Sequence, residues 1–158
     1  MHKKLVIAAL TAALLVPVMG HTKTLRWASQ GDILTLDPHA QNEGMTIAAS
    51  SYVYEPLVEY DKDFKIVPAL AVEWDTPSET VWRFKLRDGV KFHDGADFTA
   101  DDVVFSIQRA MAPTSNFKAY VNGFKDVRKV DDLTVEIETD GPNPVLLRQL
   151  TNVFIMNK

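Results

Sequence analysis

The stretch that decides the fold runs from Val81 to Arg109 and reads VWRFKLRDGVKFHDGADFTADDVVFSIQR. Its first residues alternate apolar and basic side chains, the pattern of a β-strand with one face against a core. Asp88-Gly89 and Asp94-Gly95 are turn dipeptides, so the alternation that resumes between them predicts a second short strand. From Thr99 on, acidic residues precede apolar residues at helical spacing, which indicates a capped helix. The stretch therefore predicts two strands and a helix that share one core.

On either side of this stretch we expect shorter elements of both kinds. Apolar alternation, turn residues and prolines set their bounds. In chain order they are a strand at 24–29, a helix from about Thr46 that Pro56 ends, a hairpin at 57–67, a single helical turn at 68–71, a hairpin at 124–138 and a short helix at 145–150. This mixture predicts the α/β class.

The composition is that of a globular protein with a core of its own. The chain has 158 residues, of which 46% are hydrophobic and 24% charged, so neither a disordered nor a fibrous class is indicated. Cysteine is absent. Its absence excludes disulfides, cysteine nucleophiles, thiolate metal sites and the lipidated cysteine of a bacterial lipoprotein.

Residues 1–20 have the pattern of a secretory signal peptide. Lys3-Lys4 precede an apolar run from Leu5 to Val18, and small residues near Gly20 mark a cleavage site. The alternative, an anchoring helix, is disfavoured because the run is shorter than the ~18 apolar residues of a membrane span. Cleavage would remove two lysines from a chain whose formal net charge is already −4. We therefore expect an acidic exported protein without a nucleic-acid partner.

The residues of the sequence suggest no catalytic constellation. His93 and Asp94 fall in a turn, and no neighbouring residue completes an acid–base or metal pattern around them. Asp101 and Asp102 stand at a helix start, where the helix dipole favours acids. No glycine-rich phosphate loop is present. We expect no catalytic residue, no metal site and no cofactor.

One short polar segment is required neither by a turn nor by a core. It lies between the rigid Asp37-Pro38 and the helix that we expect from about Thr46, and consists of Asn42, Glu43, Gly44 and Met45. From the residues alone, a solvated loop and a ligand contact both remain open. The same holds for Phe117, which lies in a loop that contains proline and serine.

Four segments together resemble the extracytoplasmic solute-binding proteins of family 5, the dipeptide, oligopeptide and nickel-type receptors of ABC importers. They are TLDPH at 35–39, LVEYDKDFKIVPALAVEW at 57–74, the stretch quoted above, and DDLTVEIE at 131–138. The region from Trp74 to Arg109 is the specific part, because LR, DGVKFHDG and TADDV follow one another in that order.

The resemblance implies a type II periplasmic binding protein, two-lobed and cluster C-like. Family members are much longer, so we expect only the N-terminal part of the first lobe and its small subdomain here. On this view residues 1–20 are the signal peptide, residues 21–45 begin the main lobe and supply a ligand-facing loop, and residues 46–158 form the small α/β subdomain, truncated at its C-terminal end.

The resemblance also implies a function: the substrate-binding component of an ABC importer, not an enzyme, working as a monomer in the periplasm. It would capture a peptide or similar small solute and deliver it to a permease in the inner membrane. By position, Asn42, Glu43, Gly44 and Met45 would contact the peptide backbone, and Phe117 would be a further contact.

Three other functions remain open at this point. A receptor of the same family could take nickel or another solute instead of a peptide. From other classes, we retain an exported hydrolase that uses His93, Asp94 and Asp101, and a structural module that docks to a larger envelope assembly.

Overall fold

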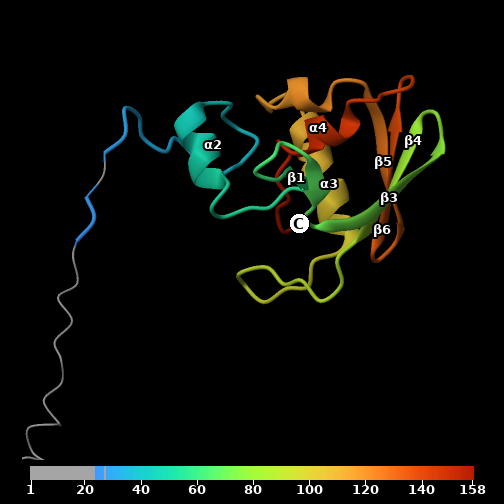
Figure 1. Ribbon diagram of the computed structural model, residues 1–158, viewed down its shortest axis with the longest axis horizontal. Coiled ribbons are helices and arrows are strands. Elements are labelled where there is room, and N and C mark those ends of the chain that lie inside the picture. Colours follow the sequence, from blue (N-terminus) through green and yellow to red (C-terminus); the bar gives the residue numbers. More distant parts are fainter. Residues whose placement is uncertain (1–23, 27) are drawn as a thin grey trace, which may run out of the picture.

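A computed structural model of the chain describes residues 24–26 and 28–158 (Figure 1). The predicted signal peptide lies outside the described residues. The elements are, in chain order, α2 (Gly44–Ser50), β1 (Val58–Tyr60), β2 (Ile66–Pro68), β3 (Ala71–Ser78), β4 (Val81–Leu86), α3 (Ala100–Met111), the 3₁₀ helix η1 (Lys118–Val121), β5 (Phe124–Asp131), β6 (Thr134–Thr139) and α4 (Leu146–Leu150). None of these helices has the length and hydropathy of a membrane span.

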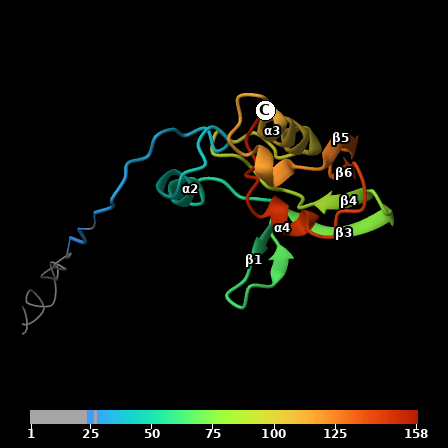
Figure 2. The same ribbon diagram turned by 90° about the horizontal axis from the view of Figure 1, so that it is seen from above.

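An antiparallel sheet in the order β3-β4-β6-β5 forms the larger part of the body. β4 is central: Phe84 pairs with Trp74 of β3 on one side and with Val135 of β6 on the other. α3 packs against β5 and β6, whereas α2 lies at the opposite end of the molecule from the sheet in both views (Figure 1, Figure 2). A separate hairpin, β1–β2, projects from the body (Figure 2).

The core lies between the sheet and the helices, and its members come from every large element. The alternation predicted for β4 is confirmed, because Phe84 and Leu86 are buried while Arg83 and Lys85 are exposed. Further fully buried members include Val103 and Ile107 of α3, Val135 and Ile137 of β6, and Leu146 and Leu150 of α4. Burial of these side chains is the main stabilising contribution to the fold.

The capped helix predicted after Thr99 is confirmed. Thr99 is the N-cap residue of α3, and one carboxylate oxygen of Asp102 accepts hydrogen bonds from the backbone N–H and the hydroxyl of Thr99, at 2.8 and 3.0 Å. Asp101 and Asp102 occupy the first turn, where their charges complement the helix dipole.

The second strand predicted within the deciding stretch is wrong. Beyond the turn at Gly89, residues 90–98 form a loop closed by a single bridge between Lys91 and Asp97, and they do not pair with β4. Gly89 and Gly95 have φ angles of +72° and +89°, which glycine adopts without strain. Both edges of β4 are occupied by β3 and β6, so the turn leads the chain away from the sheet.

Two further predictions from the flanking sequence are wrong, and two are confirmed. The described residues of 24–29 form no regular strand. No helical turn forms at 68–71: residues 69 and 70 form a bend between β2 and β3, and the N–H groups of Ala69 and Ala71 donate to the Leu57 carbonyl at 3.3 and 2.8 Å. The predicted hairpins are present as β1–β2 and β5–β6.

The face of the sheet that bears the polar residues of β4 carries a ladder of alternating charges. Asp75, Arg83, Glu136 and Arg128 stand in register on four neighbouring strands. Arg83 donates to Glu136 at 2.9 Å, and the Arg83 and Arg128 guanidinium groups hold the pKa of Glu136 below its usual range. Arg83 of the deciding stretch therefore balances an acid on an adjacent strand.

We expect Ile107→Ala to lower the free energy of unfolding by about 2–5 kcal/mol, because it leaves a cavity between α3 and the sheet. Phe105→Ala on the outer side of the same helix is the control, since Phe105 is already partly exposed, and it should cost clearly less. Urea unfolding followed by circular dichroism measures both. Equal losses for the two variants would contradict this placement of the core.

Candidate functional site

The contact strip, defined here as residues 42–45, lies at the start of α2. Glu43 is the N-cap residue of that helix: its carboxylate accepts hydrogen bonds from the N–H groups of Met45 and Thr46, at 2.9 and 3.0 Å, and from the Thr46 hydroxyl. These bonds hold the pKa of Glu43 below its usual value. The one charge in the strip is thus engaged by its own helix.

The other residues of the strip are exposed on one side, and residues 29–31 lie against the other side. Asn42 and Gly44 are exposed, whereas Met45 is half-buried. The sulfur of Met45 accepts a hydrogen bond from the Ser29 hydroxyl at 3.1 Å, and a Cβ at Gly31 would lie 3.7 Å from the Cβ of Met45. Residues 29–31 therefore pass directly behind the strip.

The strip follows an anchor segment, residues 36–40, that an ion pair ties to α3. Arg109, in the last turn of α3, donates through Nη2 to Oδ2 of Asp37 at 2.6 Å. Oδ1 of Asp37 accepts the His39 N–H at 3.0 Å. Partial burial opposes the charge of Asp37, but these two donors outweigh it and keep the pKa of Asp37 below its usual value. The pair joins positions that are 72 residues apart.

His39 is the buried centre of the anchor segment. Its side chain is 0% exposed, and among the described residues neither ring nitrogen has a hydrogen-bond partner. Burial is the largest effect on the ring and lowers the pKa of His39 to about 4, and the Arg109 charge acts in the same direction. The nearby Asp37 charge opposes both without overcoming them. The imidazole is therefore neutral at neutral pH.

Phe117 lies against the anchor segment, on the inside. Its side chain is 1% exposed, and its ring centroid lies 5.5 Å from that of His39 and 5.3 Å from that of Tyr120. The preceding residues Ser115 and Asn116 hold the segment through the His39 carbonyl, to which the Ser115 hydroxyl donates at 3.2 Å and the Asn116 N–H at 3.1 Å. The structure thus places Phe117 close to the residues that precede the strip, with its ring away from solvent.

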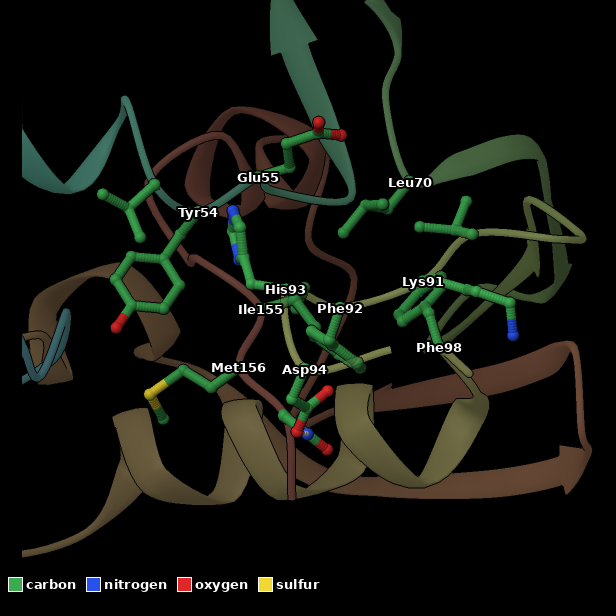
Figure 3. Close-up of a pocket in the computed structure, with 13 residues that line it drawn as sticks. Tyr54, Glu55, Leu70, Lys91, Phe92, His93, Asp94, Phe98, Ile155 and Met156 are labelled. Atoms are coloured by element: carbon green, nitrogen blue, oxygen red, sulfur yellow. Dashed lines mark hydrogen bonds between the residues drawn. The ribbon is translucent and has the colours of Figure 1, made fainter. Parts of the chain in front are cut away.

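A cavity of about 440 Å³ lies elsewhere, beyond the C-terminal end of α2 (Figure 3). Its apolar wall includes Leu70, Phe98 and Ile155, and its rim carries Tyr54, Glu55, Lys91, His93 and Asp94. None of the predicted contact residues lines it. The cavity and the contact strip are therefore two separate features, at opposite ends of one short helix.

Both carboxylates of the alternative hydrolase, Asp94 and Asp101, take part in structural contacts. Asp94 accepts hydrogen bonds from the Ala96 N–H and the Asn157 side chain, which makes it a turn residue as predicted. Asp101 pairs with Lys129 at 2.9 Å, and this ion pair keeps the pKa of the carboxyl below its usual value. Within the part of the chain that the structure describes, no cluster of three or more histidines and acids could hold a metal ion.

Sequence reasoning missed the ion pair between Asp37 and Arg109 and the burial of His39. Neither the pairing nor the burial follows from the local sequence, because the ion pair forms only where α3 and the anchor segment meet in space. Asp-Pro indicated only a rigid extended segment.

Comparison with known proteins identifies a family. The profile of the bacterial extracellular solute-binding proteins, family 5 Middle, matches residues 65–158. The glutathione-binding protein GsiB of Pectobacterium atrosepticum is 34% identical over 152 residues, which cover 94% of this chain and 29% of that protein. The chain spans less than a third of the length of such curated relatives.

Solved structures give the same result. MoaA of A. tumefaciens R10 in complex with mannopinic acid superposes with a TM-score of 0.73 at 35% identity. The match covers 80% of this chain and 28% of the MoaA chain. The murein tripeptide binding protein MppA of Escherichia coli gives a TM-score of 0.72 at 29% identity, over 78% of this chain and 28% of its own. The expected type II periplasmic binding fold, represented by part of one lobe, is confirmed.

The buried neutral imidazole predicts a pH dependence. The unfolded chain protonates His39 near pH 6.5, whereas the folded protein does so only near pH 4, so the free energy of unfolding should fall as the pH is lowered between these values. The loss should be about 2–3 kcal/mol. His39→Leu should remove this part of the pH slope, because an apolar side chain at this position binds no proton. Denaturant titrations across the range measure it.

His93→Leu is the matched control, since His93 is exposed on the cavity rim, and it should keep the wild-type slope. A His39→Leu variant with the full wild-type slope would contradict a buried neutral imidazole.

Proposed function

The chain belongs to the bacterial extracellular solute-binding proteins of family 5, and from this membership we propose that it forms part of a receptor that captures a small solute for an ABC importer. The profile match over residues 65–158 carries the proposal. The predicted signal peptide supports an exported, periplasmic receptor, and the acidic composition agrees with a small-molecule ligand and not a nucleic acid. The partner would be a permease in the inner membrane.

In such a receptor the solute stabilises a closed conformation by contacts that the open conformation lacks. A permease that recognises the closed form then receives the cargo. This mechanism needs a rigid surface that meets the solute and no group that makes or breaks bonds. The engaged carboxylates of Asp94 and Asp101 agree with binding without chemistry.

The contact strip is the part of this chain that we assign to the solute. Asn42 and Gly44 are exposed, and among the described residues the backbone N–H groups of 42–44 donate no hydrogen bond. A peptide-like solute has backbone donors and acceptors that match such groups. Glu43 contributes to solute binding by fixing the conformation of the strip, since its carboxylate caps α2. Phe117 supports the strip through its packing on His39, and direct contact would require its ring to leave that packing.

Peptide-like solutes are the class that fits the comparisons. The relatives named above bind glutathione or a murein tripeptide, and MoaA was solved with mannopinic acid. We therefore propose a small peptide or a related amino-acid derivative as the solute, with a nickel complex as the alternative within the same family.

A panel of reduced glutathione, di- and tripeptides, mannopinic acid and a nickel–histidine complex tests this function on the protein as its gene encodes it. One class should raise the unfolding free energy by about 2.7 kcal/mol at a hundredfold excess over its Kd. Mass spectrometry of the same mixtures should find every solute chemically unchanged. No stabilisation by any compound, or hydrolysis of one, would count against a receptor.

The role of Glu43 has its own test. Glu43→Ser keeps a side chain that caps a helix but removes the charge, so we expect solute affinity within about twofold of wild type. Glu43→Val removes the cap as well and should weaken binding more, because the first turn of α2 then loses its side-chain acceptor. Calorimetry with the best compound of the panel measures both. A large loss in Glu43→Ser would instead assign the carboxylate to direct contact with the solute.

A further inference from the structure

The anchor segment is fixed at both ends by groups from other parts of the chain. The Tyr54 hydroxyl donates to the Leu36 carbonyl at 2.8 Å, and the side-chain amide of Asn116 donates to the Ala40 carbonyl at 2.6 Å. Tyr54 follows α2 and Asn116 follows α3, so the segment is held between the two helices. The carbonyls at both ends of the segment thus accept hydrogen bonds from residues outside it.

The ion pair of Asp37 with Arg109 is the charged contact among these ties. The Arg109 and Asp37 side chains are 21% and 36% exposed, so the pair is only partly solvated. The second terminal nitrogen of Arg109, Nη1, is buried and has no hydrogen-bond partner among the described residues. Removal of either partner would leave a poorly solvated charge and free the turn at Asp37.

The contact strip has limited support besides the anchor segment. Ser29 and Gly31 lie against Met45, and Ile47 of α2 is partly buried against the core. Of the residues of α2 only Thr46 and Ser50 are buried, and the helix stands apart from the sheet in both views (Figure 1, Figure 2). Three Cα–Cα steps separate His39 from Asn42, so the Cα atom of Asn42 lies within about 11 Å of the Cα atom of His39. The position of the strip therefore depends on the anchor segment together with these few contacts of α2.

We propose that Arg109 is a positioning residue for solute binding: through Asp37 it holds the anchor segment, and with it the contact strip, in the conformation that meets the solute. Arg109 acts from the end of α3 and through Asp37, not by touching the strip itself. The proposal rests on the proposed function for its consequence in binding, but the rigidity of the strip is measurable without any solute.

Four variants of the pair, made in the protein as its gene encodes it, test the proposal. Asp37→Asn keeps an oxygen for the His39 N–H but loses the charge, and Arg109→Gln loses the opposite charge. Their double variant completes a thermodynamic cycle. Arg109→Lys keeps a cation that reaches one carboxylate oxygen, as in the single hydrogen bond seen here. Arg83→Gln is the matched control, because Arg83 forms a comparable ion pair on the sheet.

Hydrogen exchange at the Met45 and Thr46 amides is the first readout, since both amides are bonded to Glu43 in the native strip. Exchange should be about tenfold faster in Asp37→Asn, Arg109→Gln and the double variant, while sheet amides keep their protection. Arg109→Lys should restore the wild-type rate, and Arg83→Gln should not change it. Unchanged exchange in the charge-loss variants, or an equal loss of protection throughout the sheet, would overturn the proposal.

Affinity for reduced glutathione is the second readout. If the strip holds its binding conformation for only a tenth of the time, the apparent Kd rises about tenfold, and the double variant should lose no more than either single variant. Additive losses, or affinity unchanged despite faster exchange, would contradict positioning through the pair. If the wild type does not bind glutathione, that result counts against glutathione as the solute, and the exchange measurement alone decides the proposal.

Discussion

The packing of α3 on the sheet is the contact on which the rest of the structure depends. Ile107 is fully buried on the inner side of this helix, and two residues later Arg109 reaches the anchor segment. The loop after the helix supplies Asn116 and Phe117, which hold the same segment through a hydrogen bond and through packing on His39. The helix thus transmits the rigidity of the core to a strip that has little packing of its own.

Local sequence predicted the local features well and the distant contacts poorly. The cap at Thr99 and the alternation in β4 depend on near neighbours, and both are confirmed. The strand expected beyond Gly89 fails because β4 pairs instead with β3 and β6. The family resemblance located the contact strip, although its assignment to a solute stays a prediction. The tie between Asp37 and Arg109 left no signal, because no local pattern encodes a contact across 72 positions.

The function that we propose is binding without chemistry. The carboxylates that suggested an enzyme are occupied by turns and ion pairs, and the carboxylate of Glu43 is occupied by its own helix. The groups of the strip that stay free to meet a solute are mainly backbone groups. Such groups suit the proposed receptor for peptide-like molecules, because they can pair with the main-chain groups that these molecules share. The apolar cavity beside Ile155 is a separate feature and no predicted contact residue lines it.

Amide chemical shifts measured while a stabilising solute is titrated into the isotope-labelled protein test the central claim most directly. The account predicts that the largest changes fall at residues 42–46, with smaller changes in the anchor segment and none across the sheet. Changes confined to the cavity rim at His93 and Asp94, with the strip unaffected, would contradict it.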